Sequence, residues 1–163
     1  MRAEVFASLG SNQNREYYIR SAVMALRDRY GELRLSPVYQ NRAVGFDGDD
    51  FLNMVVAFHT QMTPQEIQQQ FREIEDAHGR IRDGKKFAPR QLDIDLILYA
   101  DLVCNEGTLR LPRADIVKYA FVLLPLAALE PEGRHPELNT TYAQMWDEYE
   151  GNRELDVMDM KFD

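Results

Sequence analysis

The chain is short of cysteine and histidine and has no long apolar run, and each shortage excludes a class of protein. Its 163 residues contain one Cys, which excludes an intrachain disulfide and a zinc cluster built from several cysteines. No apolar stretch approaches the roughly 20 residues that a membrane-spanning helix needs. The first residues run into strand-like sequence without the pattern of a signal peptide. We therefore expect a cytoplasmic or other reducing location, with no membrane partner.

Several common catalytic motifs are also absent from the sequence. The three histidines, His59, His78 and His135, are scattered and lack the His-Glu-x-x-His spacing of a zinc site. There is no Gly-x-x-x-x-Gly-Lys-Ser/Thr phosphate loop and no Gly-x-Ser-x-Gly nucleophile turn. These absences argue against a zinc enzyme, a P-loop nucleotidase and a serine hydrolase.

Charge is unevenly distributed along the chain. The net charge is −8, which argues against nonspecific nucleic-acid binding, because such binding depends on neutralising phosphates. The residues from Arg80 to Arg90 nevertheless carry five basic residues and one acid, so the rest of the chain carries −12. A local reversal of this kind can focus a polyphosphate onto one part of the surface.

Two aspartates follow directly after this basic segment. In the run 90–100, apolar residues alternate with Asp93 and Asp95, which is the period of a strand. Alternate residues of a strand share a face, so the two carboxylates lie about 7 Å apart along the chain. Mg²⁺ prefers oxygen ligands and is commonly held by one or two carboxylates plus substrate phosphates. The segment 80–95 therefore predicts a site for Mg²⁺ and a nucleotide phosphate.

The hydrophobic pattern predicts six main elements over the first hundred residues. In chain order they are a strand at 4–9, a helix at 17–30, strands at 33–40 and 51–60, a helix from 63 to about 78, and a strand at 92–99. This βαββαβ order is typical of a ferredoxin-like α+β sheet with helices packed on it.

Further elements are expected after this unit, as C-terminal additions. They are a small hairpin formed by 102–103 and 108–111, a helix at 121–129 and a helix at 141–149. Beyond residue 151 the sequence is polar and acidic, which is typical of a loosely held tail. Because neither a repeat nor a linker divides the chain, we expect residues 1–163 to form one domain.

Six motifs occur in a fixed order along the chain, and together they carry a resemblance that a lone Asp-x-Asp would not. They are Ser8-Leu9-Gly10-Ser11-Asn12, Val38-Tyr39 with Gly45, Phe51-Leu52-Asn53, Ile74-Glu75 with Gly79-Arg80-Ile81-Arg82, Pro89-Arg90 with Leu92-Asp93-Ile94-Asp95, and Leu111-Pro112 with Phe121-Val122-Leu123-Leu124-Pro125-Leu126. From residue 4 to about 136 the sequence resembles the 6-hydroxymethyl-7,8-dihydropterin pyrophosphokinase family of folate biosynthesis. The resemblance implies transfer of the terminal pyrophosphate of ATP to the hydroxymethyl group of a reduced pterin, with release of AMP.

The resemblance also implies roles for single residues on the phosphate side. Two Mg²⁺ ions would be held by Asp93 and Asp95, which suits an in-line displacement assisted by two metals. The catalytic set it implies is Asp93, Asp95, Arg80 and Arg90. The ATP-binding set it implies is Glu75, Arg80, Arg82, Arg90 and Arg113, in which the guanidinium groups suit phosphate oxygens.

On the pterin side, the resemblance implies that Asn53 hydrogen-bonds the ring, since an amide offers both a donor and an acceptor. Phe51 and Phe121 match the aromatic positions of the pterin pocket, with Phe121 in the stacking role. The backbone around Val44 and Gly45 would complete the hydrogen bonds.

The chain departs from the family pattern at several positions, and these keep three hypotheses open. The departures are Arg113 for a His on the ATP phosphates, Tyr119 for an Arg, Phe87 for a Trp of the catalytic loop, Asn41-Arg42 for a Thr-Pro pair, and Phe51 for a Tyr of the pterin pocket. The first hypothesis is the family reaction, the second is the same chemistry on a different pterin alcohol, and the third is a noncatalytic pterin- or nucleotide-binding paralogue. The partners expected are a pterin and ATP, without nucleic acid, and the chain is expected to be a monomer.

Overall fold

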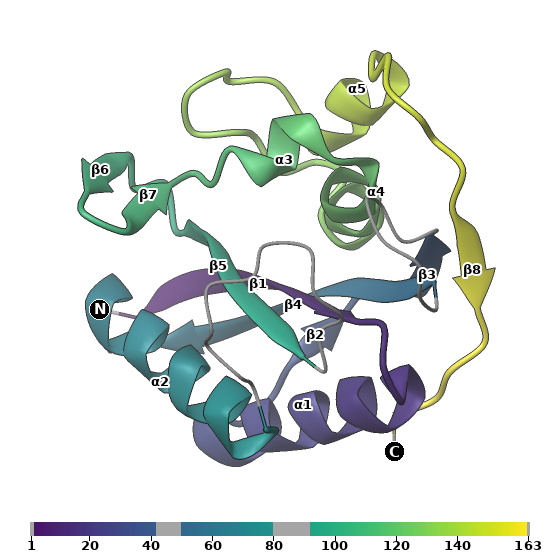
Figure 1. Ribbon diagram of the computed structural model, residues 1–163. Helices are drawn as coiled ribbons and strands as arrows, with labels where there is room; N and C mark the ends of the chain where they lie inside the picture. Colours follow the sequence, from purple (N-terminus) through teal and green to yellow (C-terminus); the bar gives the residue numbers. More distant parts are fainter. Residues whose placement is uncertain (1, 42–49, 80–91, 163) are drawn as a thin grey trace.

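A six-stranded antiparallel sheet forms the centre of the molecule (Figure 1). The computed structural model describes residues 2–41, 50–79 and 92–162. The strands of this sheet are β1 (Ala3–Ser11), β2 (Arg34–Leu35), β3 (Val38–Asn41), β4 (Phe51–Thr60), β5 (Asp93–Tyr99) and β8 (Asp156–Met158). They lie in the order β5-β1-β4-β3-β8, and β2 also pairs with β4. The first strand is thus central, between two strands that come later in the chain, and the predicted α+β arrangement is confirmed.

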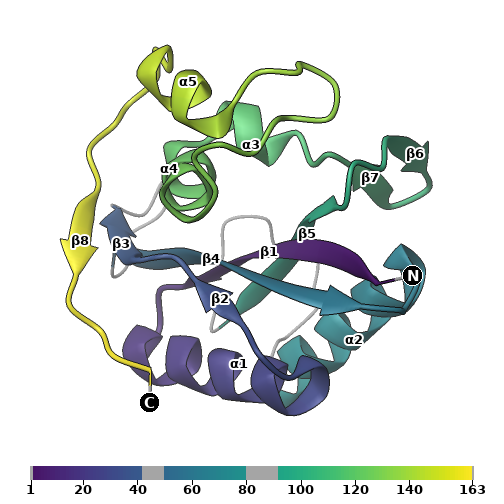
Figure 2. The same cartoon turned by 180° about the vertical axis from the view of Figure 1, so that it is seen from behind.

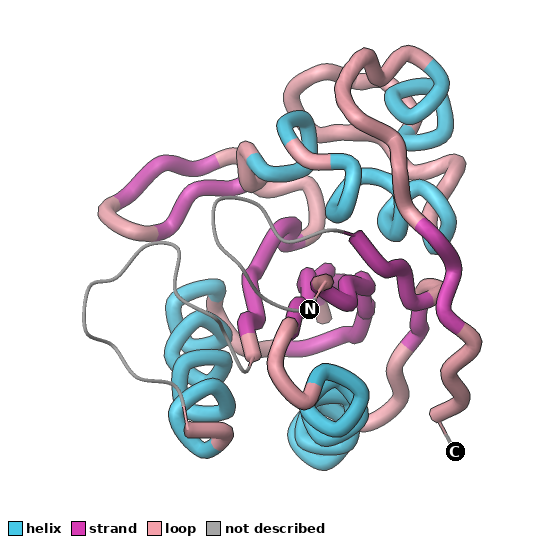
Figure 3. The backbone as a smooth tube through the Cα atoms, turned by 45° about the vertical axis from the view of Figure 1, so that its right-hand side comes forward, coloured by secondary structure: helices cyan, strands magenta, loops and turns pink. Residues whose placement is uncertain are grey.

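Helices cover both faces of the sheet (Figures 1 and 2). On one face lie α1 (Arg15–Tyr30) and α2 (Pro64–Ala77), and on the other lie α3 (Asp115–Lys118), α4 (Ala120–Leu129) and α5 (Tyr142–Asp147). Alternate residues of β1 serve the two layers, because Val5 and Leu9 pack in the core with α1 and α2, whereas Phe6 packs in the core with α4. Figure 3 shows α1 and α2 beneath the strands. In the described ranges, no helix combines the length and the apolar character that a membrane span requires.

The start of α2 is set by its local sequence. The Thr63 hydroxyl accepts a hydrogen bond from the Glu66 N–H, and the Glu66 carboxylate accepts one from the Thr63 N–H. This capping box satisfies two backbone donors that the first turn of a helix leaves unpaired, and Pro64 needs no such partner. At α1 the N-cap is Asn14, in a left-handed conformation and without a side-chain cap bond.

The predicted strand 33–40 is two short strands, β2 and β3, separated by Ser36 and Pro37. Proline has no N–H to give to a ladder, so the pairing with β4 is interrupted there. Ser36 takes over the local bonding: its N–H donates to the Val55 carbonyl, and its hydroxyl accepts from the Val55 N–H, both at 2.9 Å. The break therefore leaves β3 in place beside β4.

The hairpin is formed by β6 (Cys104–Glu106) and β7 (Leu109–Leu111), so its first arm begins two residues later than the sequence predicts. The chain first turns after β5, where Ala100 has a positive φ of 49° and the Leu102 N–H donates to the Tyr99 carbonyl. The short helix α3 was not expected, whereas α4 and α5 lie within one or two residues of the predicted helices.

The sequence predicts a loosely held tail beyond residue 151, whereas the structure attaches this segment to the sheet. Strand β8 pairs antiparallel with β3, and the Phe162 carbonyl accepts a hydrogen bond of 3.2 Å from Arg27. Phe162 also packs against the core beneath the sheet. The polar composition of the segment beyond residue 151 did not indicate this attachment, because an edge strand is held largely by backbone hydrogen bonds that any sequence can make.

Candidate active site

Asp93 and Asp95 lie on β5, on the face of the sheet that carries α4. Ile94 and Leu96 point into the core beneath the sheet, and Ile97 belongs to the core with α4, so the two aspartates share the α4 side. Both side chains are half-buried. The predicted pair of carboxylates on one strand face is therefore present.

The strand register brings Asn53 into line with these aspartates. Gly10 of β1 pairs with Asp93 on one side and with Asn53 of β4 on the other. Adjacent strands are about 4.8 Å apart, so the backbones of Asp93 and Asn53 are about 10 Å apart across β1. Residues forty or more positions apart in the sequence thus form one row on one face.

Arg113 reaches the same row from the segment that follows β7. Its guanidinium Nη2 lies 3.7 Å from Asp95 Oδ1, and its Nε lies 3.4 Å from Asp115 Oδ2. These separations are those of ion pairs rather than of well-aligned hydrogen bonds. The backbone N–H of Arg113 donates to the Ile97 carbonyl at 3.0 Å, which fixes this segment against β5. The structure therefore places the Arg113 cation beside the aspartate pair and adds the carboxylate of Asp115, which was not expected, whereas the role of Arg113 toward ATP stays a prediction.

The electrostatic environment of Asp95 is set mainly by partial burial. Desolvation raises the pKa of Asp95 to about 6; Arg113 acts in the opposite direction, and the carboxylates of Asp93 and Glu75 raise it further. A cation bound here would relieve this unfavourable concentration of negative charge. Within the described ranges, no group of three or more His, Cys, Asp or Glu side chains could hold a metal, so a cation at the aspartate pair would need further oxygens from substrate or water.

Glu75 lies beneath this end of β5, on α2, and is buried. Its Oε2 accepts a 2.9 Å hydrogen bond from the Ile94 N–H. The contact ties α2 to the outer edge of β5 between the two aspartates. The expected place of Glu75 in the nucleotide pocket stays a prediction.

Asn53 is almost fully buried, with 4% of its surface exposed. Its side-chain N–H donates to the Oδ1 of Asn41 on the neighbouring strand β3. On its other side, a Cβ atom added to Gly10 would lie 3.0 Å from Asn53 Oδ1. Gly10 therefore leaves room for the Asn53 amide.

The two predicted aromatic residues come from different elements. Phe51 shares the strand face of Asn53, because the two residues are two positions apart on β4. Phe121 is half-buried at the start of α4 and stacks on Tyr119, with ring centroids 4.9 Å apart and an interplanar angle of 16°. Tyr119 is 42% exposed. This stacking was not predictable from sequence patterns, since the bend between α3 and α4 brings the rings together.

The remaining predicted site residues lie outside the described residues. They are Val44, Gly45, Arg80, Arg82 and Arg90, together with the departures Arg42 and Phe87. Their roles stay predictions.

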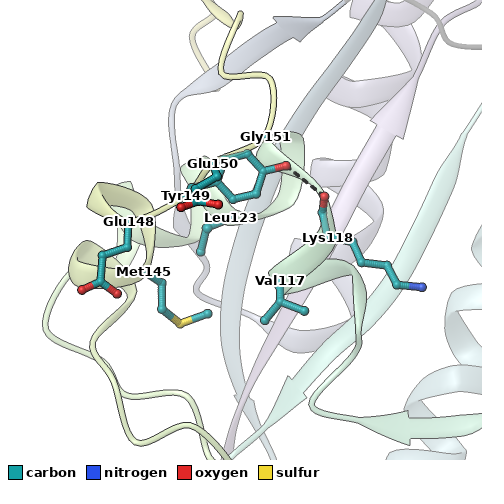
Figure 4. Close-up of a pocket in the computed structure, with 8 residues that line it drawn as sticks. All are labelled: Val117, Lys118, Leu123, Met145, Glu148, Tyr149, Glu150 and Gly151. Atoms are coloured by element: carbon teal, nitrogen blue, oxygen red, sulfur yellow. Dashed lines mark hydrogen bonds between the residues drawn. The ribbon is translucent and has the colours of Figure 1, made fainter.

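A cavity of about 470 Å³ lies elsewhere, between α3, α4 and α5, and none of the predicted site residues lines it (Figure 4). The Tyr149 hydroxyl crosses one side of it and donates a 2.9 Å hydrogen bond to the Lys118 carbonyl. The Lys118 side chain extends away from the other lining residues (Figure 4). The cavity is therefore separate from the row that contains Asp93 and Asn53.

Comparison with known proteins gives one consistent family. The family described as 7,8-dihydro-6-hydroxymethylpterin-pyrophosphokinase (HPPK) matches residues 6–131. The 2-amino-4-hydroxy-6-hydroxymethyldihydropteridine pyrophosphokinase of Aquifex aeolicus is 35% identical over 136 residues, which cover 82% of this chain and 84% of that protein. The enzyme of the same name from Pseudomonas aeruginosa is 33% identical over 141 residues, covering 84% and 86%.

The fold has a counterpart among solved structures. A Plasmodium falciparum HPPK-DHPS chain, solved with pteroate, superposes with a TM-score of 0.77 at 13% identity. The match covers 91% of this chain and 42% of the Plasmodium chain, so the chain spans about two fifths of that protein's length. At this identity the match supports the fold alone.

Proposed function

The chain belongs to the 7,8-dihydro-6-hydroxymethylpterin-pyrophosphokinase family, and from this we propose that it transfers pyrophosphate from ATP to the hydroxymethyl group of 6-hydroxymethyl-7,8-dihydropterin. The hydroxymethyl oxygen forms a bond to the β-phosphorus of ATP and gives up its proton to water. The bond between the β-phosphorus and the oxygen shared with the α-phosphate breaks, and AMP leaves with that oxygen. The observation that carries this proposal is the single row of Asp93, Gly10 and Asn53 across three strands. It puts a carboxylate for the phosphate side and an amide for the pterin side on one face.

On the phosphate side, the chain's own residues supply ligands and counter-charge. Asp93 and Asp95 offer carboxylate oxygens that suit two Mg²⁺ ions, which when bound neutralise phosphate charge and polarise the reacting oxygens. Asp95 has a pKa of about 6 and is therefore mostly ionised at neutral pH. Arg113, already beside Asp95, is placed to bind a phosphate oxygen with its guanidinium. We assign Arg80, Arg82, Arg90 and Glu75 to the nucleotide as well, on the motif resemblance.

On the pterin side, Asn53 hydrogen-bonds the ring and Phe121 stacks on it, with Phe51 at the pocket wall. The buried position of Asn53 supports this role, since a buried amide forms hydrogen bonds to a ligand with little competition from water. The backbone at Val44 and Gly45 completes the set by resemblance. Binding on this side orients the hydroxymethyl group toward the carboxylates about 10 Å away.

We also propose that the protein acts in the cytoplasm as a monomer. The single Cys104 supports a reducing compartment. Light scattering during size-exclusion chromatography at the concentration of the activity assay would test the oligomeric state.

The test of the function is product analysis by mass spectrometry. Purified protein is incubated with Mg-ATP and 6-hydroxymethyl-7,8-dihydropterin, and AMP together with the pterin pyrophosphate is the expected result. The Asp95→Asn variant is the matched control for contaminating kinases. ADP in place of AMP would overturn the proposal, and so would the absence of AMP from folded protein.

A second candidate is the same transfer to a different pterin alcohol, and the contact between Asn41 and Asn53 favours it. The chain has Asn41 where the family resemblance expects a threonine, and that residue touches the amide assigned to the ring. AMP formed with another pterin alcohol, but not with 6-hydroxymethyl-7,8-dihydropterin, would select this candidate.

A further inference from the structure

The Asn53 side chain is held from two sides. The side-chain Oδ1 of Asn41 accepts a hydrogen bond from Asn53 Nδ2, and Gly10 faces Asn53 Oδ1. Asn53 is 4% exposed, so the amide has little room to reorient. The two neighbours come from β3 and β1, the strands on either side of β4.

The register explains why Asn41 can reach Asn53. Asn41 pairs with Phe51, and Tyr39 pairs with Asn53. In an antiparallel pair, residues opposite each other share a face, and so do residues two positions along. Asn41 is therefore a diagonal neighbour of Asn53 on the face that also carries Asp93 and Asp95.

The end of β3 is itself held in position. Arg15 donates to the Gln40 side-chain oxygen at 3.2 Å and to the Asp50 carbonyl at 2.7 Å. Gln40 in turn donates to the Asp50 carboxylate at 3.1 Å, and it pairs with Asp156 of β8. The residue next to Asn41 is thus bonded to α1, to the start of β4 and to the C-terminal strand.

A side-chain amide has a donor end and an acceptor end, and a half-turn about its last torsion exchanges them. Asn41 offers its oxygen to Asn53, so the NH₂ group of Asn53 is directed to Asn41 and its oxygen to the Gly10 side. A ligand that contacts Asn53 therefore meets one defined arrangement of donor and acceptor. While Asn41 keeps its orientation, the opposite arrangement of Asn53 would set two oxygens against each other in a half-buried place.

We propose that Asn41 is a positioning residue that sets the orientation of the Asn53 amide and thereby the hydrogen-bonding pattern that the acceptor substrate must present. The proposal rests on the proposed function for the role of Asn53 toward a pterin. Asn41 acts through Asn53, so its effect is on affinity for the acceptor and not on affinity for ATP. A ring whose donor and acceptor are exchanged at the contacted edge is rejected by the same orientation.

The test compares Asn41→Leu with Asn41→Asp, two side chains of similar size to Asn. Leucine removes the acceptor for Asn53, whereas aspartate keeps an oxygen acceptor. We expect Asn41→Leu to weaken pterin binding about tenfold, with ATP affinity within twofold of wild type, and Asn41→Asp to bind the pterin within about threefold of wild type. Asn105→Leu, in the exposed hairpin, is the control for an amide-to-leucine change.

A second readout needs no substrate. In the ligand-free protein, NMR should show one side-chain N–H of Asn53 protected from exchange, with the protection lost in Asn41→Leu and retained in Asn41→Asp. Unchanged pterin affinity and an unchanged Asn53 resonance in Asn41→Leu would overturn the proposal, and so would equal losses in both variants. If wild type neither binds the pterin nor forms AMP, the proposed function fails, whereas the Asn53 resonance still decides whether Asn41 orients the amide.

Discussion

The two halves of the site are built in different ways. The carboxylate half, which consists of Asp93, Asp95 and Arg113, concentrates charge at a partly open position: the Asp95 side chain is 40% exposed and the Arg113 guanidinium lies 3.7 Å from it. The amide half, which consists of Gly10, Asn41 and Asn53, is neutral; Gly10 and Asn53 are buried, Asn41 is half-buried, and a direct hydrogen bond joins the two asparagines.

This difference shows which half depends on its ligand. The carboxylates are held at an electrostatic cost that a bound cation removes, so the carboxylate half is stabilised when the site is filled. The two amides are joined by a hydrogen bond in the ligand-free protein and are oriented in advance, which lowers the cost of binding.

The largest effect is expected from Asp95→Asn. Removing one carboxylate from the aspartate pair should lower kcat by at least about 10³-fold, since metal assistance contributes several kcal/mol. The ligand-free variant should nevertheless be as stable as wild type or more stable, by up to about 1 kcal/mol once the exposure of Asp95 is taken into account. Steady-state kinetics and urea unfolding measure the two quantities.

The direction of this stability change follows from the pKa of Asp95, which folding raises from about 4 to about 6. This carboxylate therefore favours the folded state most below pH 4, and the contribution is lost as the pH rises to about 6. Asp101→Asn, in the exposed turn after β5, is the control and should change neither kcat nor stability. A marked loss of stability in Asp95→Asn would show that the carboxylate half is not strained by its charge.

Gly10→Ala should act on the amide half. The added Cβ would lie 3.0 Å from Asn53 Oδ1, which is too close unless the amide shifts by a few tenths of an ångström. We expect the pterin KM to rise about tenfold, because a displaced amide loses hydrogen-bond geometry, while the KM for ATP changes less than twofold. Equal changes in both KM values would mean that the two halves are not separable in this way.

A smaller and pH-dependent effect is expected for metal affinity. Protonation of Asp95, with its pKa of about 6, competes with the metal, so the Kd for Mn²⁺ as a probe should rise about fourfold between pH 7 and pH 5.5. Electron paramagnetic resonance of Mn²⁺ measures this Kd. Arg113→Ala should move the midpoint of this pH dependence of the Mn²⁺ Kd to higher pH, since Arg113 lowers the pKa of Asp95. The Kd for the pterin without metal should stay constant between pH 7 and pH 5.5. A loss of pterin affinity parallel to the loss of Mn²⁺ affinity would contradict the distinction between the carboxylate half and the amide half.

The smallest effect on turnover is expected from removing residues 152–163. This deletion exposes the outer edge of β3 and removes the Phe162 packing, so we expect the free energy of unfolding to fall by about 2 kcal/mol. The pterin KM should rise only about twofold, because β4 and Arg15 still hold the end of β3. Thermal unfolding and kinetics measure these effects, and a full loss of pterin binding would assign β8 a direct part in the amide half.

The carboxylate half was largely predictable and the amide half only in part. Asp93 and Asp95 are two positions apart on one strand, so alternation alone puts them on the same face. Asn53 was expected from the family resemblance, but its bond to Asn41 depends on the pairing of β3 with β4, which the sequence does not specify. The stacking of Tyr119 on Phe121 and the contact of Arg113 with Asp115 depend on the turn into α3 in the same way.

Local sequence patterns were sufficient to predict the capping box of α2, the alternation of β4 and β5, and the order of motifs that carries the family. These features depend on neighbours within a few residues, where spacing along the chain is also spacing in space. Which strands lie side by side became known only from the three-dimensional fold. The row of Asp93, Gly10 and Asn53, the Asn41 contact and the place of residues 152–162 all depend on that pairing. Strand pairing joins residues far apart in the chain through backbone hydrogen bonds that nearly every residue can make, so side-chain identity alone does not reveal the partner.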